Sequence, residues 1–242
     1  LAYLPPPGAC YAYGFTGCPI CGSSLGTWAS TRCSWDKPGK VSCPKGHVLP
    51  NAECPDDGTG FKAEDGRFHY LVGSWNSWVT EQWTRHAIPT LAHAYALTGD
   101  EKYAERAAFF LDALASIYPE STAGSWDYPS RPPSGRFARP WYQVSRNLVV
   151  YIEAYDLLYT SPAFRRPSLR PRLEATFPAG ATAQSRAVRT KDAYGYSKPG
   201  MTRRGNVDRN LVLDGAWYCY QHTFAGKLHN GHADYMRGAL AA

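Results

Sequence analysis

The chain has 242 residues, of which 44% are hydrophobic and 19% charged, and its formal net charge is +6. It can bury one large core or two smaller ones, and the lack of an apolar run of about 18 residues excludes a membrane span. Arginines concentrated in the second half favour an anionic partner, nucleic acid or an acidic polysaccharide, although a solvated basic surface explains the charge equally well.

Two short cysteine-containing turns near the N-terminus form the most informative pattern. They read Cys18-Pro19-Ile20-Cys21-Gly22 and Cys43-Pro44-Lys45-Gly46-His47. Two cysteines two residues apart can direct both thiolates to one point, and a second turn can complete a tetrahedral zinc site. Because Gly46 stands where a second cysteine is expected, His47 is the fourth donor that we predict, with Cys33 as its rival. The expected ligands of this structural zinc are Cys18, Cys21, Cys43 and His47; a chance spacing or a disulfide is the alternative.

Composition divides the chain near residue 66. Residues 1–66 are rich in Pro, Gly, Cys and Ser and show no helical periodicity, which predicts a small loop-rich metal-binding module. Within it, residues 56–60 form a turn cluster that leads into a short extended piece near 68–72. Residues 67–242 show helical patterns instead, so we expect a second, mainly α portion without credible strand alternation.

The helical patterns follow one another with short loops between them. A helix over 77–97 is expected to kink at Pro89, and Thr98 with Glu101 has the form of a capping box for the next helix. That helix closes at Pro119 and places its apolar stripe at Ala104, Ala107, Phe110 or Leu111, Leu114 and Ile117. Further helices are expected over 141–160, 206–223 and 231 to the end. These patterns predict an antiparallel array of helical hairpins. The start without Met and the end inside a helical pattern lead us to expect a piece of a longer protein.

An ordered set of phrases resembles the heparinase II/III-like polysaccharide lyases, from about residue 18 to the end. The phrases are the two cysteine turns, Leu49-Pro50-Asn51, Pro55-Asp56-Asp57-Gly58-Thr59-Gly60, Leu91-Ala92-His93-Ala94-Tyr95-Ala96-Leu97-Thr98-Gly99-Asp100-Glu101-Lys102-Tyr103-Ala104, Tyr142-Gln143-Val144-Ser145-Arg146, Glu153-Ala154-Tyr155-Asp156-Leu157-Leu158 and His229-Asn230-Gly231. Each helical phrase alone is generic, whereas their order is specific.

The resemblance implies an incomplete (α/α) toroid and β-elimination on a uronate-containing polysaccharide, such as a glycosaminoglycan or alginate. The family's β-sheet domains and its tyrosine acid/base would lie beyond Ala242. In that family an Asn/His pair neutralises the uronate carboxylate, which implies that Asn230 is the neutraliser and His229 its neighbour, with His232 as a substitute. An ordinary Asn-Gly turn is the alternative for this step. No metal takes part in this chemistry, and a polymer substrate implies a secreted or periplasmic protein.

Further residues are candidates for contacting the substrate. Trp75 and Trp78 can stack on a sugar and Asn76 can bond a hydroxyl, if this step precedes the first long helix; packing at the helix entry is the alternative. Tyr142 and Arg146 share one helical face. Arg146 can pair with an acidic sugar, or with a carboxylate such as Glu153 or Asp156.

Other functions fit the sequence less well. A zinc-knuckle module that binds nucleic acid is disfavoured because the arginines are far from the knuckles and no helix carries a basic recognition stripe, so no nucleic-acid partner is expected. A glycoside hydrolase needs two carboxylates across a cleft, and no pair stands out. A glycan-binding fragment without catalytic activity is the remaining alternative. The arginine runs at 164–167 and 170–172 are expected to be solvated helix ends.

Overall fold

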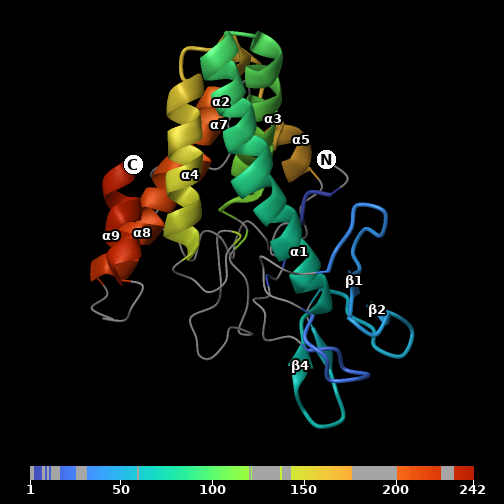
Figure 1. The fold of residues 1–242 in the computed structure, drawn as a ribbon. Coiled ribbons are helices and arrows are strands. Elements are labelled where there is room, and N and C mark those ends of the chain that lie inside the picture. The colour runs from blue at the N-terminus through green and yellow to red at the C-terminus, as the bar shows by residue number, and fades with distance from the viewer. Residues whose placement is uncertain are drawn as a thin grey trace.

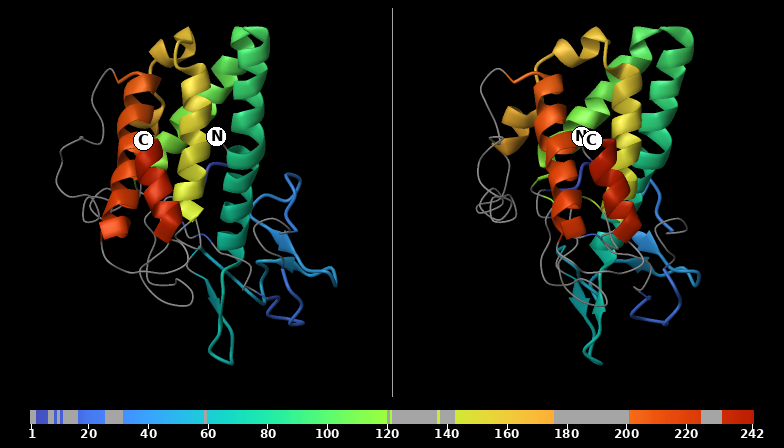
Figure 2. Two further views of the ribbon diagram at one scale, coloured as in Figure 1. Left: turned by 60° about the vertical axis from the view of Figure 1, so that its left-hand side comes forward. Right: turned by 90° about the vertical axis from the view of Figure 1, so that its left-hand side faces the viewer.

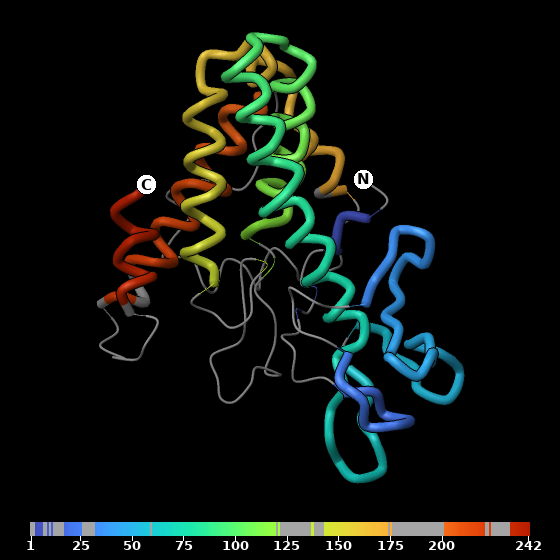
Figure 3. The backbone as a smooth tube through the Cα atoms, viewed as in Figure 1, coloured from blue at the N-terminus to red at the C-terminus, as the bar shows by residue number. Residues whose placement is uncertain are grey.

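The computed structural model describes residues 3–6, 9, 11, 17–25, 32–58, 60–119, 121, 137, 143–175, 201–224 and 232–242. This part of the chain is mainly helical, as the sequence predicts, with a small module of loops and short strands at one end (Figures 1 and 3). None of the helices in these ranges combines the length and the apolar character that crossing a bilayer requires.

Two hairpins of two-residue strands form the regular part of the module. Strand β1 (Val41–Ser42) pairs antiparallel with β2 (Val48–Leu49), and β3 (Phe61–Lys62) pairs with β4 (Phe68–His69). A small apolar cluster stabilises them and is made of Leu25, Val41, Leu49, Leu71 and the buried cysteines Cys18, Cys43 and Cys54. The module thus has its own small core, and Leu71 joins that core to the first helix.

The first helix begins earlier than the sequence predicts. Helix α1 (Leu71–Glu81) continues through a π-helical segment, η1 (Gln82–Ala87), into α2 (Ile88–Thr98). Pro89 lies in the first turn of α2, directly after the π-helical segment. Because proline cannot donate a backbone hydrogen bond, the wider helical turn before it accommodates the missing N–H. The irregularity expected at Pro89 is therefore found one turn earlier.

The capping box predicted for the next helix is wrong. Helix α3 (Glu101–Ile117) has Asp100 as its N-cap, and the Asp100 side chain accepts a hydrogen bond from the backbone N–H of Lys102. Thr98 instead ends α2, and its hydroxyl donates to the carbonyl of Ala94. Glu101 accepts hydrogen bonds from the hydroxyls of Tyr95 and Ser161, so it joins three segments rather than capping its own helix.

The remaining helices complete an array in two layers. They are α4 (Gln143–Leu158), η2 (Pro162–Arg165), α5 (Arg170–Glu174), α7 (Arg203–Val207), the π-helical η3 (Asp208–Leu213), α8 (Asp214–Phe224) and α9 (His232–Ala241). Helices α2, α4 and α9 run in one direction and pack side by side, and α3 and α7–α8 run in the opposite direction (Figures 1 and 2).

The predicted apolar stripes form the core between the layers. On α3 the buried members are Ala104, Ala107, Leu111, Leu114 and Ile117, and on α4 they are Val144, Leu148, Tyr155 and Leu158. The helices approach closely at two glycines. A Cβ on Gly215 would lie 2.6 Å from Leu148, and one on Gly238 would lie 2.7 Å from the Cβ of Ser145. At Gly238 a methyl group would overlap the facing helix close to its backbone, and at Gly215 it would displace the side chain of Leu148.

One arginine that we expected in solvent is buried. Arg170 is fully buried, and its Nη1 donates to the carbonyl of Ser116 at 2.7 Å. It adjoins a polar network around Asp112, whose carboxylate accepts hydrogen bonds from Ser168, Leu169 and Asn206. The network joins α3, the start of α5 and α7, so the second half of the chain is fixed to the first by polar contacts as well as by apolar ones.

Candidate functional site

The four predicted metal ligands come together. The ligand atoms of Cys18, Cys21, Cys43 and His47 all lie within 4.8 Å of one another. Cys18 and Cys43 are buried, and the other two side chains are half-buried. Cys33, the rival fourth ligand, is outside this group and packs between the module and the helices. The residues therefore form a closed cluster that can hold a metal ion.

Two tight turns position these side chains. In the first, the N–H of Gly22 donates to the carbonyl of Cys18 at 2.8 Å, and in the second, the N–H of Gly46 donates to the carbonyl of Cys43 at 3.0 Å. Gly22 and Gly46 have φ values of 71° and 89°, which glycine adopts without strain. The second turn closes the β1–β2 hairpin, so the strand register fixes Cys43 opposite His47.

Three of the separations between the ligand atoms are close to those around a tetrahedral ion. The Sγ atoms of Cys21 and Cys43 lie 3.8 Å apart, and Nδ1 of His47 lies 3.6 Å from Sγ of Cys18 and 3.2 Å from Sγ of Cys43. Bond lengths of about 2.3 Å to sulfur and about 2.0 Å to nitrogen give tetrahedral edges of roughly 3.8 Å and 3.5 Å. The donor set of three thiols and one imidazole fits a structural site in which no coordination position stays open.

Hydrogen bonds prepare one of the thiols for metal binding. Bonds from the hydroxyl and the backbone N–H of Ser23 lower the pKa of Cys21 to about 6. Burial raises the pKa of the Cys18 thiol instead. Since the thiolate is the form that binds metal, Cys21 is prepared for binding more readily than Cys18 at neutral pH.

Asp56 connects the module to the helical array. One carboxylate oxygen accepts hydrogen bonds from the N–H groups of Gly58 and Gly60 at 2.8 and 2.9 Å. The other accepts from the N–H groups of Leu71 and Val72, which open α1, at 2.8 and 2.9 Å. The turn cluster that the sequence indicates is thus also a remote cap for the first helix, where a negative charge is favourable.

The predicted sugar-contacting residues of α1 lie inside the helix rather than before it. Trp75 is 6% and Asn76 3% exposed, and Trp78 is half-buried. Trp35 of the module packs against both indoles, with ring centroids 4.5 Å from Trp78 and 6.0 Å from Trp75, and the two indoles themselves lie 5.3 Å apart. The geometry supports the alternative in which this step packs the helix entry, because little of Trp75 or Asn76 reaches solvent.

A groove that the sequence did not reveal lies beside this aromatic cluster. It has a volume of about 460 Å³, and its apolar walls include Trp35, Trp83 and Phe110. Gln82 and His86 provide polar groups in the same groove. The rings of Trp83 and Phe110 lie 5.1 Å apart. Spacing along η1 and α2 places Gln82, Trp83 and His86 on one face, but only the fold brings Trp35 and Phe110 to them.

Arg146 is paired within the protein, with a partner different from the two we considered. It donates to both carboxylate oxygens of Asp234, through Nε at 3.1 Å and through Nη2 at 2.9 Å. Asp234 lies in the first turn of α9, so this fork-to-fork pair fixes the start of α9 against the first turn of α4. Arg146 is therefore a positioning residue at the beginning of α9.

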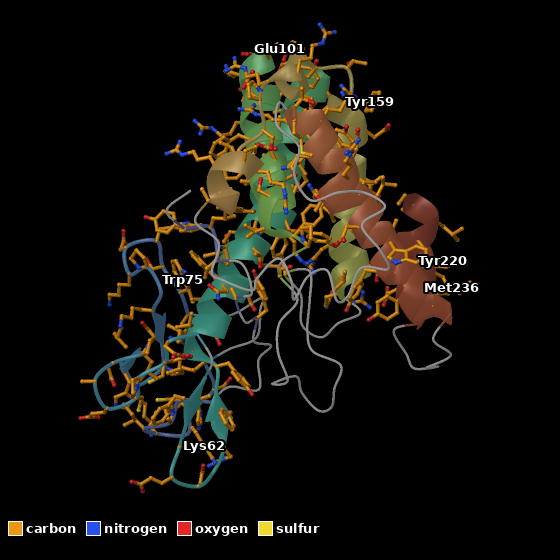
Figure 4. All side chains as sticks on the ribbon, turned by 180° about the vertical axis from the view of Figure 1, so that it is seen from behind. Lys62, Trp75, Glu101, Tyr159, Tyr220 and Met236 are labelled. Atoms are coloured by element: carbon orange, nitrogen blue, oxygen red, sulfur yellow. The ribbon has the colours of Figure 1, made fainter. Side chains whose placement is uncertain are left out.

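The other predicted site residues precede or open α4 and α9 in the sequence. Tyr142, His229 and Asn230 lie outside the described residues, and His232 is the first residue of α9, whose side chain the structure does not describe. Helices α1, α4 and α9 all begin at the end of the array that carries the module (Figure 4, where Trp75 marks this end and Glu101 the other). All the predicted substrate-contacting residues that lie in helices belong to these three helices.

Glu81 should make the free energy of unfolding depend measurably on pH. Burial raises the pKa of Glu81 to about 7, although its ion pair with Arg85 opposes that shift. Its unfolded pKa is about 4.3, so the folded state binds more protons between about pH 4 and pH 7. The free energy of unfolding should therefore fall as pH rises through this window, by on the order of 2 kcal/mol, and become flat above it.

Urea titrations from pH 4.5 to pH 8 check this expectation. Glu81→Gln should flatten the profile, whereas Glu53→Gln, which changes an exposed carboxylate, should leave it as it is. An unchanged profile in Glu81→Gln would assign the pH dependence to other groups.

Comparison of the chain with known protein families, with curated proteins and with solved structures finds no match.

Proposed function

We propose that this chain is the helical portion of a polysaccharide lyase that cleaves an acidic, uronate-containing polysaccharide, with zinc as a structural ion in its N-terminal module. The ordered phrases of the sequence support this proposal. The observation that carries it furthest is the groove of Trp35, Trp83 and Phe110, since flat apolar walls with a few polar groups suit a sugar ring.

An incomplete (α/α) toroid is the architecture that we propose for residues 67–242. A toroid is built from consecutive hairpins whose helices alternate in direction and form two layers. The parallel helices α2, α4 and α9, backed by α3 and α7–α8, are compatible with such a segment. The zinc-clamped module then braces the first hairpin, through Asp56 and through the packing of Trp35 on α1.

The proposed chemistry removes the proton at C5 of the uronate and breaks the bond between C4 and O4, leaving a double bond between C4 and C5. Asn230 is assigned the neutralisation of the uronate carboxylate, with His229 beside it, because charge that develops there needs a fixed hydrogen-bond donor. A base accepts the C5 proton, and the departing O4 takes up a proton from an acid. The ion pair between Arg146 and Asp234 supports this assignment because it fixes α9, which begins two residues after Asn230 in the sequence.

The test is an ultraviolet assay for the unsaturated uronate. The full-length protein should produce this absorbance on at least one of alginate, heparan, chondroitin and hyaluronan. Asn230→Ala should reduce the turnover rate by about 10²- to 10³-fold, the usual cost of removing one such donor. His229→Ala should also reduce it, and His93→Ala, a matched change of an exposed histidine on α2, should not.

Three outcomes would contradict the proposal. No absorbance on any uronate polymer would exclude the lyase, and reducing ends without the chromophore would indicate hydrolysis. Binding without any cleavage would identify a glycan-binding protein, the second candidate, which the aromatic groove alone would satisfy.

A further inference from the structure

A basic cavity lies on α3, away from the groove and from the cysteine cluster. It has a volume of about 300 Å³ and is lined by Lys102, Glu105, Arg106, Phe109 and Arg203. The first four residues follow one another at helical spacing on one face of α3. Lys102 is next to Glu101, which marks the end of the array opposite the module (Figure 4).

Backbone pairing explains why a second arginine reaches this cavity. The N–H of Arg203 donates to the carbonyl of Arg166 at 2.9 Å, and the N–H of Ser168 donates to the carbonyl of Met201 at 2.9 Å. These bonds align the segment before α7 with the segment before α5. Arg166 and Arg203 consequently both extend over Glu105.

Among the described residues that line the cavity, Glu105 is the only carboxylate, and two cations already share it. One oxygen of Glu105 pairs with Nε of Arg166 at 2.6 Å, and the other pairs with Nη1 of Arg203 at 3.1 Å. Lys102 pairs with Asp100 at 2.7 Å at the exposed rim. Within the part of the chain that the structure describes, Arg106 has no carboxylate partner. The cavity is therefore cationic, and Arg106 is available to bind an anion.

We propose that this cavity is an anion subsite that binds the carboxylate or sulfate of one sugar of an acidic polysaccharide. Arg106 forms the charge-assisted hydrogen bonds, because a guanidinium matches the planar face of such anions. Phe109 supplies an apolar wall for the sugar ring. Lys102 and the largely buried Arg203 add positive potential, and neither needs to contact the bound anion directly.

The position of the subsite gives it a role that is separate from cleavage. Helix α3 has 17 residues and so is about 25 Å long, and the cavity lies in its first half. Phe109 lines this cavity and Phe110 lines the groove of Trp35 and Trp83, so the two sites lie on different faces of α3.

The inference rests on the proposed function for its ligand, but its test does not require cleavage. End-labelled octasaccharides of alginate and of chondroitin sulfate are titrated against the full-length protein carrying Asn230→Ala, and fluorescence polarisation gives Kd. Adding Arg106→Gln should weaken binding of at least one of them about tenfold. Arg172→Gln, which removes the same charge from an exposed position on α5, should change Kd by less than twofold. Thermal unfolding of both variants should match that of their parent, because neither side chain supports the fold.

Several results would overturn the inference. Equal weakening of binding by Arg106→Gln and Arg172→Gln would indicate a nonspecific basic surface. Unchanged binding in Arg106→Gln would rule out the subsite, even if the protein is a lyase. Competition by inorganic sulfate at the same concentration as the octasaccharide would identify a site for free anions. Tighter, Arg106-dependent binding of a single-stranded oligonucleotide would assign the cavity to nucleic acid.

Conversely, Arg106-dependent glycan binding in a protein that never produces the unsaturated uronate would support the subsite and contradict the proposed lyase activity.

Discussion

Replacing Cys43 with serine is expected to abolish zinc binding and to unfold the N-terminal module. Cys43 is buried, and its sulfur lies 3.2 Å from Nδ1 of His47 and 3.8 Å from the sulfur of Cys21, so it is central to the cluster. Structural zinc sites contribute about 10–16 kcal/mol of apparent binding free energy, most of which is folding free energy for a small module. The module's apolar cluster, built from few aliphatic side chains, cannot replace that contribution.

Metal analysis and thermal unfolding test this expectation together. The purified protein should contain one zinc ion, and Cys43→Ser should contain none and lose the unfolding transition of the module. Cys33→Ala is the matched control, because Cys33 is a half-buried cysteine outside the cluster. A Cys33→Ala protein that loses its zinc, beside a His47→Ala protein that keeps it, would show that the ligand set is wrong.

Loss of the zinc should also weaken the helical array, though by less. Asp56 caps the first turn of α1, and Trp35 packs on Trp78 of the same helix. Both contacts depend on the module keeping its fold. A helix cap contributes about 1 kcal/mol, so we expect the main transition to shift by a few degrees rather than to disappear.

The local patterns in the sequence predicted what depends on neighbours along the chain. The two cysteine turns have the spacing and the glycines that bring their ligands to one point, and the structure places His47 rather than Cys33 in the cluster. The stripes of α3 and α4 follow helical periodicity, so their buried faces were predictable. Mainly helical architecture follows directly from such stripes.

Features that depend on contacts between distant segments were not predictable in this way. Nothing near Arg170 in the sequence reveals Ser116, whose carbonyl it binds. Trp75 lies inside α1 rather than before it. This helix starts at Leu71, whose N–H donates to the carboxylate of Asp56, 15 residues earlier in the chain. Arg146 was matched with carboxylates on its own helix, whereas its partner, Asp234, is on α9. In each case the contact that decides the role of the side chain comes from a segment distant in the sequence.

Replacing Asp112 with alanine is expected to be the most destabilising single change in the helical array. Asp112 is fully buried, and its carboxylate accepts hydrogen bonds from the hydroxyl of Ser168, the N–H of Leu169 and the amide of Asn206 at 2.7, 2.7 and 2.8 Å. Alanine would leave these buried donors without an acceptor. Removing one partner from such a network typically costs about 3–5 kcal/mol.

A more conservative substitution separates the hydrogen bonds from the charge. Burial raises the pKa of Asp112, while the hydrogen bonds from Asn206, Leu169 and Ser168 lower it. Asn at this position keeps one acceptor oxygen and loses the other, so Asp112→Asn should cost less than alanine, about 1–3 kcal/mol. Asp36→Ala, a change of an exposed aspartate, should be nearly neutral.

Urea denaturation gives the decisive comparison, because α3, α5 and α7 are joined by this network and should unfold in one transition. The midpoint should fall most in Asp112→Ala, less in Asp112→Asn and hardly at all in Asp36→Ala. Asn206→Ala removes the donor that bonds both the carboxylate and the backbone carbonyl of Asp112. Because the two side chains share these bonds, the double variant should be less destabilised than the sum of the single ones. Strict additivity would mean that the two residues stabilise the array independently of each other.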